Sequence, residues 1–144
     1  MNPLIVGMLL SLAPISELRG GIPYAIAKGI NPWLAFTCCA IANIIAIIVV
    51  FLFLELVHRI LLKIPFYRKK VDKIRNGHNK SGFFMLTVLA AIPLPVIGGA
   101  WTAALIAWVL GLNKMKSFLA IAIGTVIAGI ITTLATIGII KLFF

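Results

Sequence analysis

Apolar positions in this 144-residue chain fall into four long regions separated by short polar ones. Two regions are uninterrupted, Trp33 to Val57 and Ser117 to Ile140, and each exceeds the roughly 20 residues that cross a bilayer as a helix. The other two, Leu4 to about Lys28 and Gly82 to Leu112, are broken, which leaves arms of roughly ten to fifteen apolar residues. Arms of that length are typical of a re-entrant hairpin whose irregular tip faces protein or water.

The order of these regions repeats along the chain as a broken segment, a full helix, a basic loop, a second broken segment and a second full helix. Gly20-Gly21 follows Pro14 in the first half much as Gly98-Gly99 follows Pro93 in the second. We therefore expect an all-α membrane protein of two inverted repeats, each a re-entrant helical hairpin followed by a full transmembrane helix. The expected single membrane domain, 1–144, divides into a first repeat (1–57), a basic cytoplasmic loop (58–80) and a second repeat (81–144).

Small side chains recur at four-residue spacing along both full helices. Such stripes let helix backbones approach closely in a bilayer, although small residues are also simply common in membrane helices. Cys38 and Cys39 are adjacent, so they suit helix packing better than a disulfide or a metal site. The stripes offer an inter-subunit contact as well, which favours a homodimer. Their members are Cys38, Ala42 and Ala46, then Ala120, Gly124, Ala128, Thr132 and Thr136.

Composition agrees with a membrane protein. The chain is 62% hydrophobic and 11% charged, whereas a soluble domain is about half apolar and about a quarter charged. The mean hydropathy is +1.18. No Lys or Arg precedes the first apolar stretch, so this stretch does not have the pattern of a secretory signal peptide.

The net charge of +10 would suggest nucleic acid in a soluble protein, but its distribution favours a topology signal. Eight of the thirteen Lys and Arg residues lie between Arg59 and Lys80, beside a predicted span and without an aromatic readout pattern. With two re-entrant hairpins, Lys114 and Lys116 join this loop and give ten basic residues on one side; with four spans the division is nine against three. The positive-inside rule therefore favours the hairpins, with the loop cytoplasmic and both termini outside the plasma membrane.

The basic loop has an amphipathic pattern of its own, with Tyr67, Val71 and Ile74 spaced as on one helical face. One interpretation is a short helix that lies on anionic lipid headgroups, and the other is a solvated loop whose charges only set topology. Asp72 is expected to pair with neighbouring bases within the loop.

The two remaining acids, Glu17 and Glu55, differ in their surroundings. Glu55 precedes Arg59 by one helical turn, so a pair at the helix end explains it. Glu17 and Arg19 instead lie inside an apolar segment, where a charge at mid-depth costs roughly 2.5–3.5 kcal/mol on insertion scales. Glu17 is a candidate proton carrier, and the guanidinium of Arg19 suits phosphate or carboxylate. The alternative is that these two side chains satisfy only each other or nearby backbone.

The second tip carries no charge. Its glycines let backbone N–H groups turn toward an anion, and the half-helix that follows presents a positive N-terminal dipole. Trp101 is expected to form an apolar wall or to contact a ligand, and Asn43 to hydrogen-bond a broken helix. No nucleophile–His–acid set and no metal-ligand spacing is present in the sequence, so neither an enzyme nor a cofactor is predicted.

The sequence motifs at the two tips resemble those of a known protein family. Glu17-Leu18-Arg19-Gly20-Gly21-Ile22-Pro23, Ala91-Ile92-Pro93-Leu94-Pro95 and Gly99-Ala100-Trp101-Thr102 resemble the motifs of the small multidrug export protein family. That family is similar to the DedA (VTT) superfamily. The superfamily resemblance implies two inverted re-entrant hairpins and transport of polyprenyl-phosphate carriers or scrambling of phospholipids, sometimes proton-coupled. DedA members carry arginines near the second hairpin, and this chain has none there, so phosphate binding would fall to Arg19 and backbone N–H groups.

These observations predict a small transporter that flips or scrambles an anionic lipid, with Glu17 as the proton-linked acid and Arg19 as the headgroup ligand. Efflux of small cationic or amphipathic solutes, bound directly by Glu17, is a second hypothesis. A membrane scaffold that recruits partners through the basic loop is a third. The expected substrate-binding residues are Glu17, Arg19, Gly20, Gly21, Pro23, Pro93, Pro95, Gly98, Gly99, Trp101 and Thr102.

Overall fold

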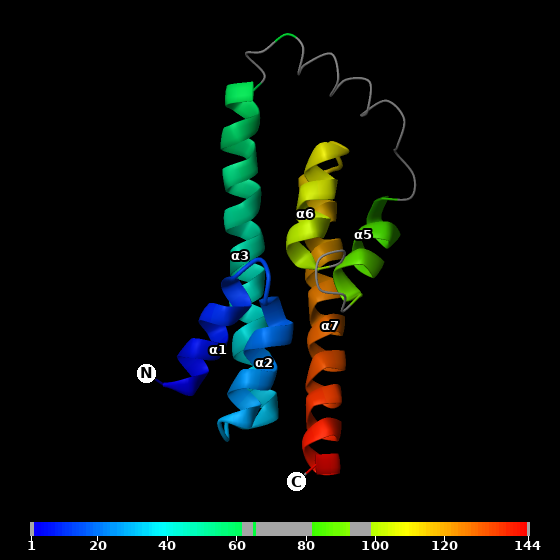
Figure 1. The fold of residues 1–144 in the computed structure, drawn as a ribbon. Coiled ribbons are helices and arrows are strands. Elements are labelled where there is room, and N and C mark those ends of the chain that lie inside the picture. The colour runs from blue at the N-terminus through cyan, green and yellow to red at the C-terminus, as the bar shows by residue number, and fades with distance from the viewer. Residues whose placement is uncertain (1, 62–64, 66–81, 93–98, 144) are drawn as a thin grey trace.

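The computed structural model describes residues 2–61, 65, 82–92 and 99–143 (Figure 1). Within these ranges the regular elements are all helices, and no strand is present. The helices are α1 (Pro3–Leu12), α2 (Glu17–Ala27), α3 (Pro32–Leu61), α5 (Gly82–Ala91), α6 (Ala100–Val109) and α7 (Lys114–Phe143).

Two helices dominate the fold. α3 and α7 are 30 residues each, or about 45 Å at 1.5 Å per residue, and they run in opposite directions (Figure 1). Their segments Pro32–Val57 and Lys114–Leu142 are long and apolar enough to cross a membrane. Large apolar side chains on them, such as Leu52 and Leu134, are more than half exposed. An exposed apolar surface of this extent suits contact with lipid rather than with water.

The short helices form two pairs. α1 and α2 lie beside the N-terminal half of α3, whereas α5 and α6 lie beside the N-terminal half of α7 (Figure 1). Each short helix has 10 or 11 residues and is therefore about 15 Å long, half the thickness of a bilayer core. The end of α1 and the start of α2 lie at mid-height of the molecule, as do the end of α5 and the start of α6 (Figure 1).

The first break lies earlier than the sequence pattern suggested. α1 ends at Leu12 and α2 begins at Glu17, so Gly20, Gly21 and Pro23 are inside α2 rather than at the tip. The expectation that they interrupt the helix is wrong, because packing against α1 overrides their weak helix propensity. A Cβ at Gly21 would overlap the Gly7 carbonyl and the Ser11 hydroxyl of α1, so only glycine allows this approach.

The two halves match at a spacing of 82 residues. α3 (Pro32–Leu61) and α7 (Lys114–Phe143) correspond end to end at this spacing. The preceding helices stop alike, at Gly29 with φ 86° and at Gly111 with φ 64°. In each case the glycine N–H and the following N–H bond carbonyls of the last turn, which is a Schellman stop. Asn31 and Asn113 then accept hydrogen bonds from the first turns of α3 and α7.

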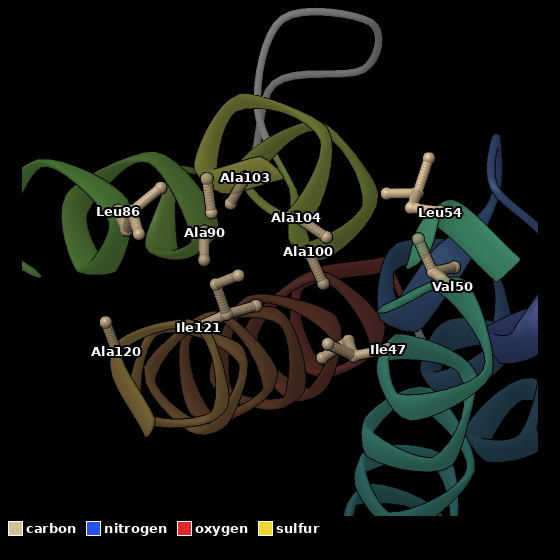
Figure 2. Packing of buried hydrophobic residues seen from close by; sticks show 11 residues of the cluster. Ile47, Val50, Leu54, Leu86, Ala90, Ala100, Ala103, Ala104, Ala120 and Ile121 are labelled. Carbon is tan, nitrogen blue, oxygen red and sulfur yellow. The ribbon is translucent and has the colours of Figure 1, made fainter. Parts of the chain in front are cut away.

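Small residues make the core. Alanines of α6 pack against α5, α3 and α7, where Ala100 points toward Ile47 and Ile121 (Figure 2). The stripes expected from the sequence are largely buried within the chain: Ala42, Ala46, Ala120, Gly124, Ala128 and Thr136. Close helix packing inside one chain therefore uses them. The homodimer and the division into 1–57, 58–80 and 81–144 stay predictions.

Several expectations concern residues outside the described ranges. These are the amphipathic helix of the basic loop, the pairing of Asp72, and the roles given to Pro93, Pro95 and Gly98.

Candidate functional site

The two helix breaks meet through one carboxylate. Glu17, the first residue of α2, is 7% exposed, and its Oε1 accepts a hydrogen bond from the Trp101 backbone N–H at 3.3 Å. Trp101 is in the first turn of α6, and Gly99 is the residue that precedes that helix. The carboxylate thus caps a helix that lies 84 residues away along the chain. A negative charge at a helix N-terminus is stabilised by the exposed N–H groups and by the helix dipole.

Glu17 adopts an unusual backbone conformation to do this. Its φ of 45° is positive, and residues other than glycine rarely adopt a positive φ. Its counterpart 82 residues later is Gly99, which also has a positive φ, of 127°. An ideal Cβ on Gly99 would lie 2.5 and 2.7 Å from the Glu17 carboxylate oxygens. Glycine at position 99 therefore leaves the space that the carboxylate fills.

Arg19 reaches the other end of the same break. Its Nη2 donates to the Ile92 carbonyl at 2.8 Å, just beyond the last residue of α5. A cation at a helix C-terminus complements the negative end of the helix dipole. The acid and the base of the first tip thus bind opposite ends of the break in the second half. A charge-assisted hydrogen bond of this kind contributes about 1.5–3 kcal/mol.

The structure brings together part of the predicted site. Glu17, Arg19, Gly99 and Trp101 lie at the junction, and Thr102 follows in the first turn of α6. Gly20 and Gly21 instead shape the contacts of α2, since Gly21 adjoins α1 and Gly20 adjoins the Ser16 side chain. Pro23 is inside α2, where it lacks the N–H that would bond the Arg19 carbonyl.

The sequence did not predict that three buried polar atoms would lack a hydrogen-bond partner among the described residues. Asn43 Oδ1, Trp101 Nε1 and Thr125 Oγ1 are buried and have no hydrogen-bond partner within the part of the chain that the structure describes. For Asn43 the expected hydrogen bond to a broken helix is therefore not found at its carbonyl oxygen. The sequence signal for Thr125 was its place 82 residues after Asn43.

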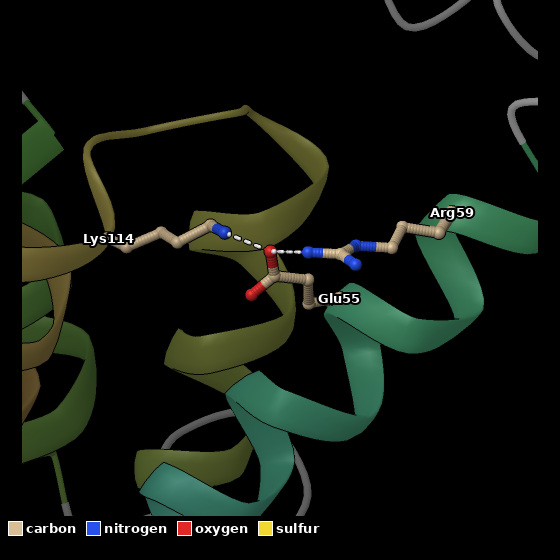
Figure 3. Close-up of polar contacts among 3 residues, drawn as sticks. All are labelled: Glu55, Arg59 and Lys114. Atoms are coloured by element: carbon tan, nitrogen blue, oxygen red, sulfur yellow. Dashed lines mark hydrogen bonds and ion pairs between the residues drawn. The ribbon is translucent and has the colours of Figure 1, made fainter.

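A second polar cluster lies at the end of α3. Glu55 Oε1 is 3.4 Å from Arg59 Nη2, which confirms the expected pair, and 2.9 Å from Lys114 Nζ (Figure 3). The contact with Lys114 was missed, because the sequence does not show that α7 begins beside the end of α3. These ion pairs are partly exposed, and pairs of that kind contribute about 0–1 kcal/mol.

The residues that the structure describes contain no group of three or more His, Cys, Asp or Glu side chains that would hold a metal ion together. Cys38 and Cys39 are unpaired thiols, and Cys39 lies against α1, where a Cβ on Gly7 would be 3.6 Å from its Sγ.

Comparison with known proteins gives one match. The sequence model of a family described as "Putative small multi-drug export protein" matches residues 17–131, from the first residue of α2 to the middle of α7. The comparisons with curated proteins and with solved structures gave no match.

Proposed function

Because the chain belongs to the small multi-drug export protein family and is a membrane transporter, we propose that it moves an anionic lipid, a polyprenyl-phosphate or a phospholipid, across the bilayer. The observation that carries this proposal is the junction at which Glu17 caps α6 and Arg19 caps α5. The proposed site lies between the start of α6 and the end of α5, and the two charged side chains there support recognition of a charged group.

The proposed topology has two inverted repeats with re-entrant hairpins, a cytoplasmic basic loop and both termini outside. Its support is the 2.9 Å contact between Glu55 and Lys114, since α7 then begins at the end of the molecule where α3 ends. Four crossings would separate those ends. The half-bilayer length of the four short helices agrees.

In the proposed mechanism Glu17 occupies an anion site that the substrate also uses. The N-terminus of α6 offers backbone N–H groups to a negative group, and the Glu17 carboxylate holds that place. Protonation of Glu17 removes its charge and weakens its hold on the Trp101 N–H. A lipid phosphate then takes over the helix N-terminus and the guanidinium of Arg19, which links translocation to a proton.

A surface groove supports a lipid substrate. It has a volume of about 400 Å³ and is lined by apolar side chains including Phe51, Leu52 and Phe118, together with Glu55 and Lys114. A groove with a mostly apolar lining and a few charged groups suits an acyl chain beside a headgroup.

Reconstituted vesicles test the proposal. Purified protein is placed in vesicles with a fluorescent phospholipid or polyprenyl phosphate, and translocation is followed by chemical quenching of the outer leaflet. Glu17→Gln and Arg19→Gln are expected to reduce the rate at least tenfold. Lys28→Gln and Lys141→Gln are the matched controls, because each removes a charge at a helix end away from both the junction and the groove. Unchanged translocation in both junction variants would contradict the assignment.

Efflux of a small cationic solute is the second candidate, favoured by the family description and by the buried carboxylate of Glu17. Thermal shift separates the two. Stabilisation of the purified protein by organic cations but not by lipid phosphates, lost in Glu17→Gln, would favour efflux over lipid transport.

A further inference from the structure

The two long helices carry an unexplained pair of polar residues. Asn43 of α3 and Thr125 of α7 are each 1% exposed, and they stand 82 residues apart, so they are equivalent positions of the two halves. Asn43 Oδ1 and Thr125 Oγ1 have no hydrogen-bond partner among the described residues. A buried polar group without a partner costs about 1–3 kcal/mol, so two at matching positions indicate a missing ligand.

Thr125 differs from other helical threonines of the chain. Thr37, Thr87, Thr132, Thr133 and Thr136 each donate to the carbonyl four residues earlier, at 2.7–3.0 Å. That bond is the ordinary way for a threonine hydroxyl to be satisfied in an apolar helix. Thr125 does not make it, so its hydroxyl oxygen is left for something other than its own backbone.

Packing contacts above and below Asn43 and Thr125 indicate that the two residues lie at the same height along α3 and α7. One turn beyond Asn43 is Ile47, and one turn before Thr125 is Ile121; both pack in one cluster with Ala100 at the start of α6 (Figure 2). Because α3 and α7 are antiparallel, Asn43 and Thr125 both lie one turn below that cluster.

One helical turn below Asn43 and Thr125, Leu18 of α2 packs against both α3 and α7. Leu18 packs with Cys39, one turn before Asn43, and an ideal Cβ on Gly129, one turn after Thr125, would be 3.4 Å from the Leu18 side chain. Leu18 adjoins Glu17, and Ala100 adjoins the Trp101 N–H that Glu17 binds. Since Ala100 packs one turn above Asn43 and Thr125 and Leu18 packs one turn below them, we infer that the Glu17 carboxylate lies at about the same height as these two residues.

We propose that Asn43, Thr125 and Glu17 form a binding site for a monovalent hard cation of the sodium type. An amide oxygen, a hydroxyl oxygen and one carboxylate are ligands that such ions prefer. Protonation of Glu17, as in the mechanism proposed above, would by itself leave the two neutral oxygens unexplained, since neither titrates. A divalent ion is disfavoured, because only one carboxylate is present and Arg19 lies two residues away from it. The third unpartnered atom, Trp101 Nε1, is a donor and cannot bind a cation.

Thermal unfolding in detergent micelles tests the site without any transport, so its result is separate from that of the lipid assay. Sodium chloride is titrated against choline chloride at constant ionic strength. A site that binds sodium in the folded state alone raises Tm by about 3–6 °C at a tenfold excess over Kd. Asn43→Leu and Thr125→Val are expected to abolish this shift. Thr133→Val is the matched control, because it removes a buried hydroxyl that is already bonded to Gly129.

The outcomes are distinct. A sodium shift that is lost in Asn43→Leu and Thr125→Val and retained in Thr133→Val supports the site. Equal Tm values in sodium and choline overturn it, as does a shift that persists in Thr125→Val. Variants that gain stability equally in every salt also overturn it, since they indicate a buried water or an unfilled polar pair. If the variants do not fold, equilibrium dialysis of the unaltered protein with radioactive sodium decides: saturable binding supports the site, and its absence overturns it.

Discussion

Gly99→Ala is the sharpest test of the junction between the two halves. Gly99 precedes α6 with φ 127°, a conformation that side-chain-bearing residues rarely adopt. A Cβ at this position would also lie 2.5 Å from one Glu17 carboxylate oxygen and 2.7 Å from the other. The substitution therefore disturbs both the backbone of residue 99 and the cap that Glu17 places on α6.

The two effects have separable magnitudes. Backbone strain in a sparsely populated region costs about 1–3 kcal/mol. A carboxylate that moves away loses a charge-assisted hydrogen bond to the Trp101 N–H, worth about 1.5–3 kcal/mol. We expect Gly99→Ala to lower the free energy of unfolding by about 2.5–6 kcal/mol. The measurement is an SDS titration of protein in mixed micelles, followed by tryptophan fluorescence.

Gly138→Ala is the matched control. A Cβ at Gly138 meets no atom within 4 Å, and the residue lies inside α7, so alanine should raise the free energy of unfolding by about 0.5–1 kcal/mol. If Gly99→Ala lowered the free energy of unfolding by no more than the magnitude of the change in Gly138→Ala, the close contact at the junction would be refuted.

A double-mutant cycle tests whether Glu17 is the residue that a side chain at position 99 would contact. In a Glu17→Ala background the carboxylate is gone, so Gly99→Ala should cost only the strain of about 1–3 kcal/mol. The coupling energy between the two positions is expected to be about 1.5–3 kcal/mol. Additive effects would show that Glu17 does not occupy the space beside Gly99.

Three further predictions concern helix packing, charge and capping. Gly124→Ala should lower the free energy of unfolding by about 1–3 kcal/mol in the same SDS titration, because its Cβ would lie 2.6 Å from the Thr87 carbonyl oxygen. Glu55→Gln should leave it nearly unchanged, since the contacts with Arg59 and Lys114 are exposed to solvent; a loss as large as that of Gly124→Ala would contradict the weakness of these pairs. Asn113→Ala should cost about 1 kcal/mol by removing the cap of α7, and circular dichroism should show an unchanged helix content.

Several features of the fold could be predicted because they depend on local composition. Trp33 to Val57 and Ser117 to Ile140 are predominantly apolar and long enough to cross a bilayer, so each was expected to be a helix, and α3 and α7 extend only a few residues beyond them. The pair Glu55–Arg59 was predictable from its spacing of one helical turn. The breaks in the other two regions were also expected, although the first lies at residues 13–16 rather than at Gly20-Gly21.

Gly20-Gly21 illustrates why the position of a break is difficult to predict. Glycine weakens a helix by about 1 kcal/mol relative to alanine, which is little beside the packing that a close approach of α1 and α2 allows. Propensity therefore indicated a break where tertiary contact maintains a helix.

Membership of the family rests on the sequence, which matches over residues 17–131.

Residue types and their spacing suffice to show that this chain is helical and apolar, with two charges inside one broken segment. The contacts of Glu17 and Arg19 are seen only once the chain is folded. Their partners, the Trp101 N–H and the Ile92 carbonyl, are backbone groups 84 and 73 residues away, and any residue type would supply them, except that proline lacks the N–H. A partner without a side-chain signature leaves no trace in the sequence, so the way the charged tip holds the uncharged one is visible only in the folded chain.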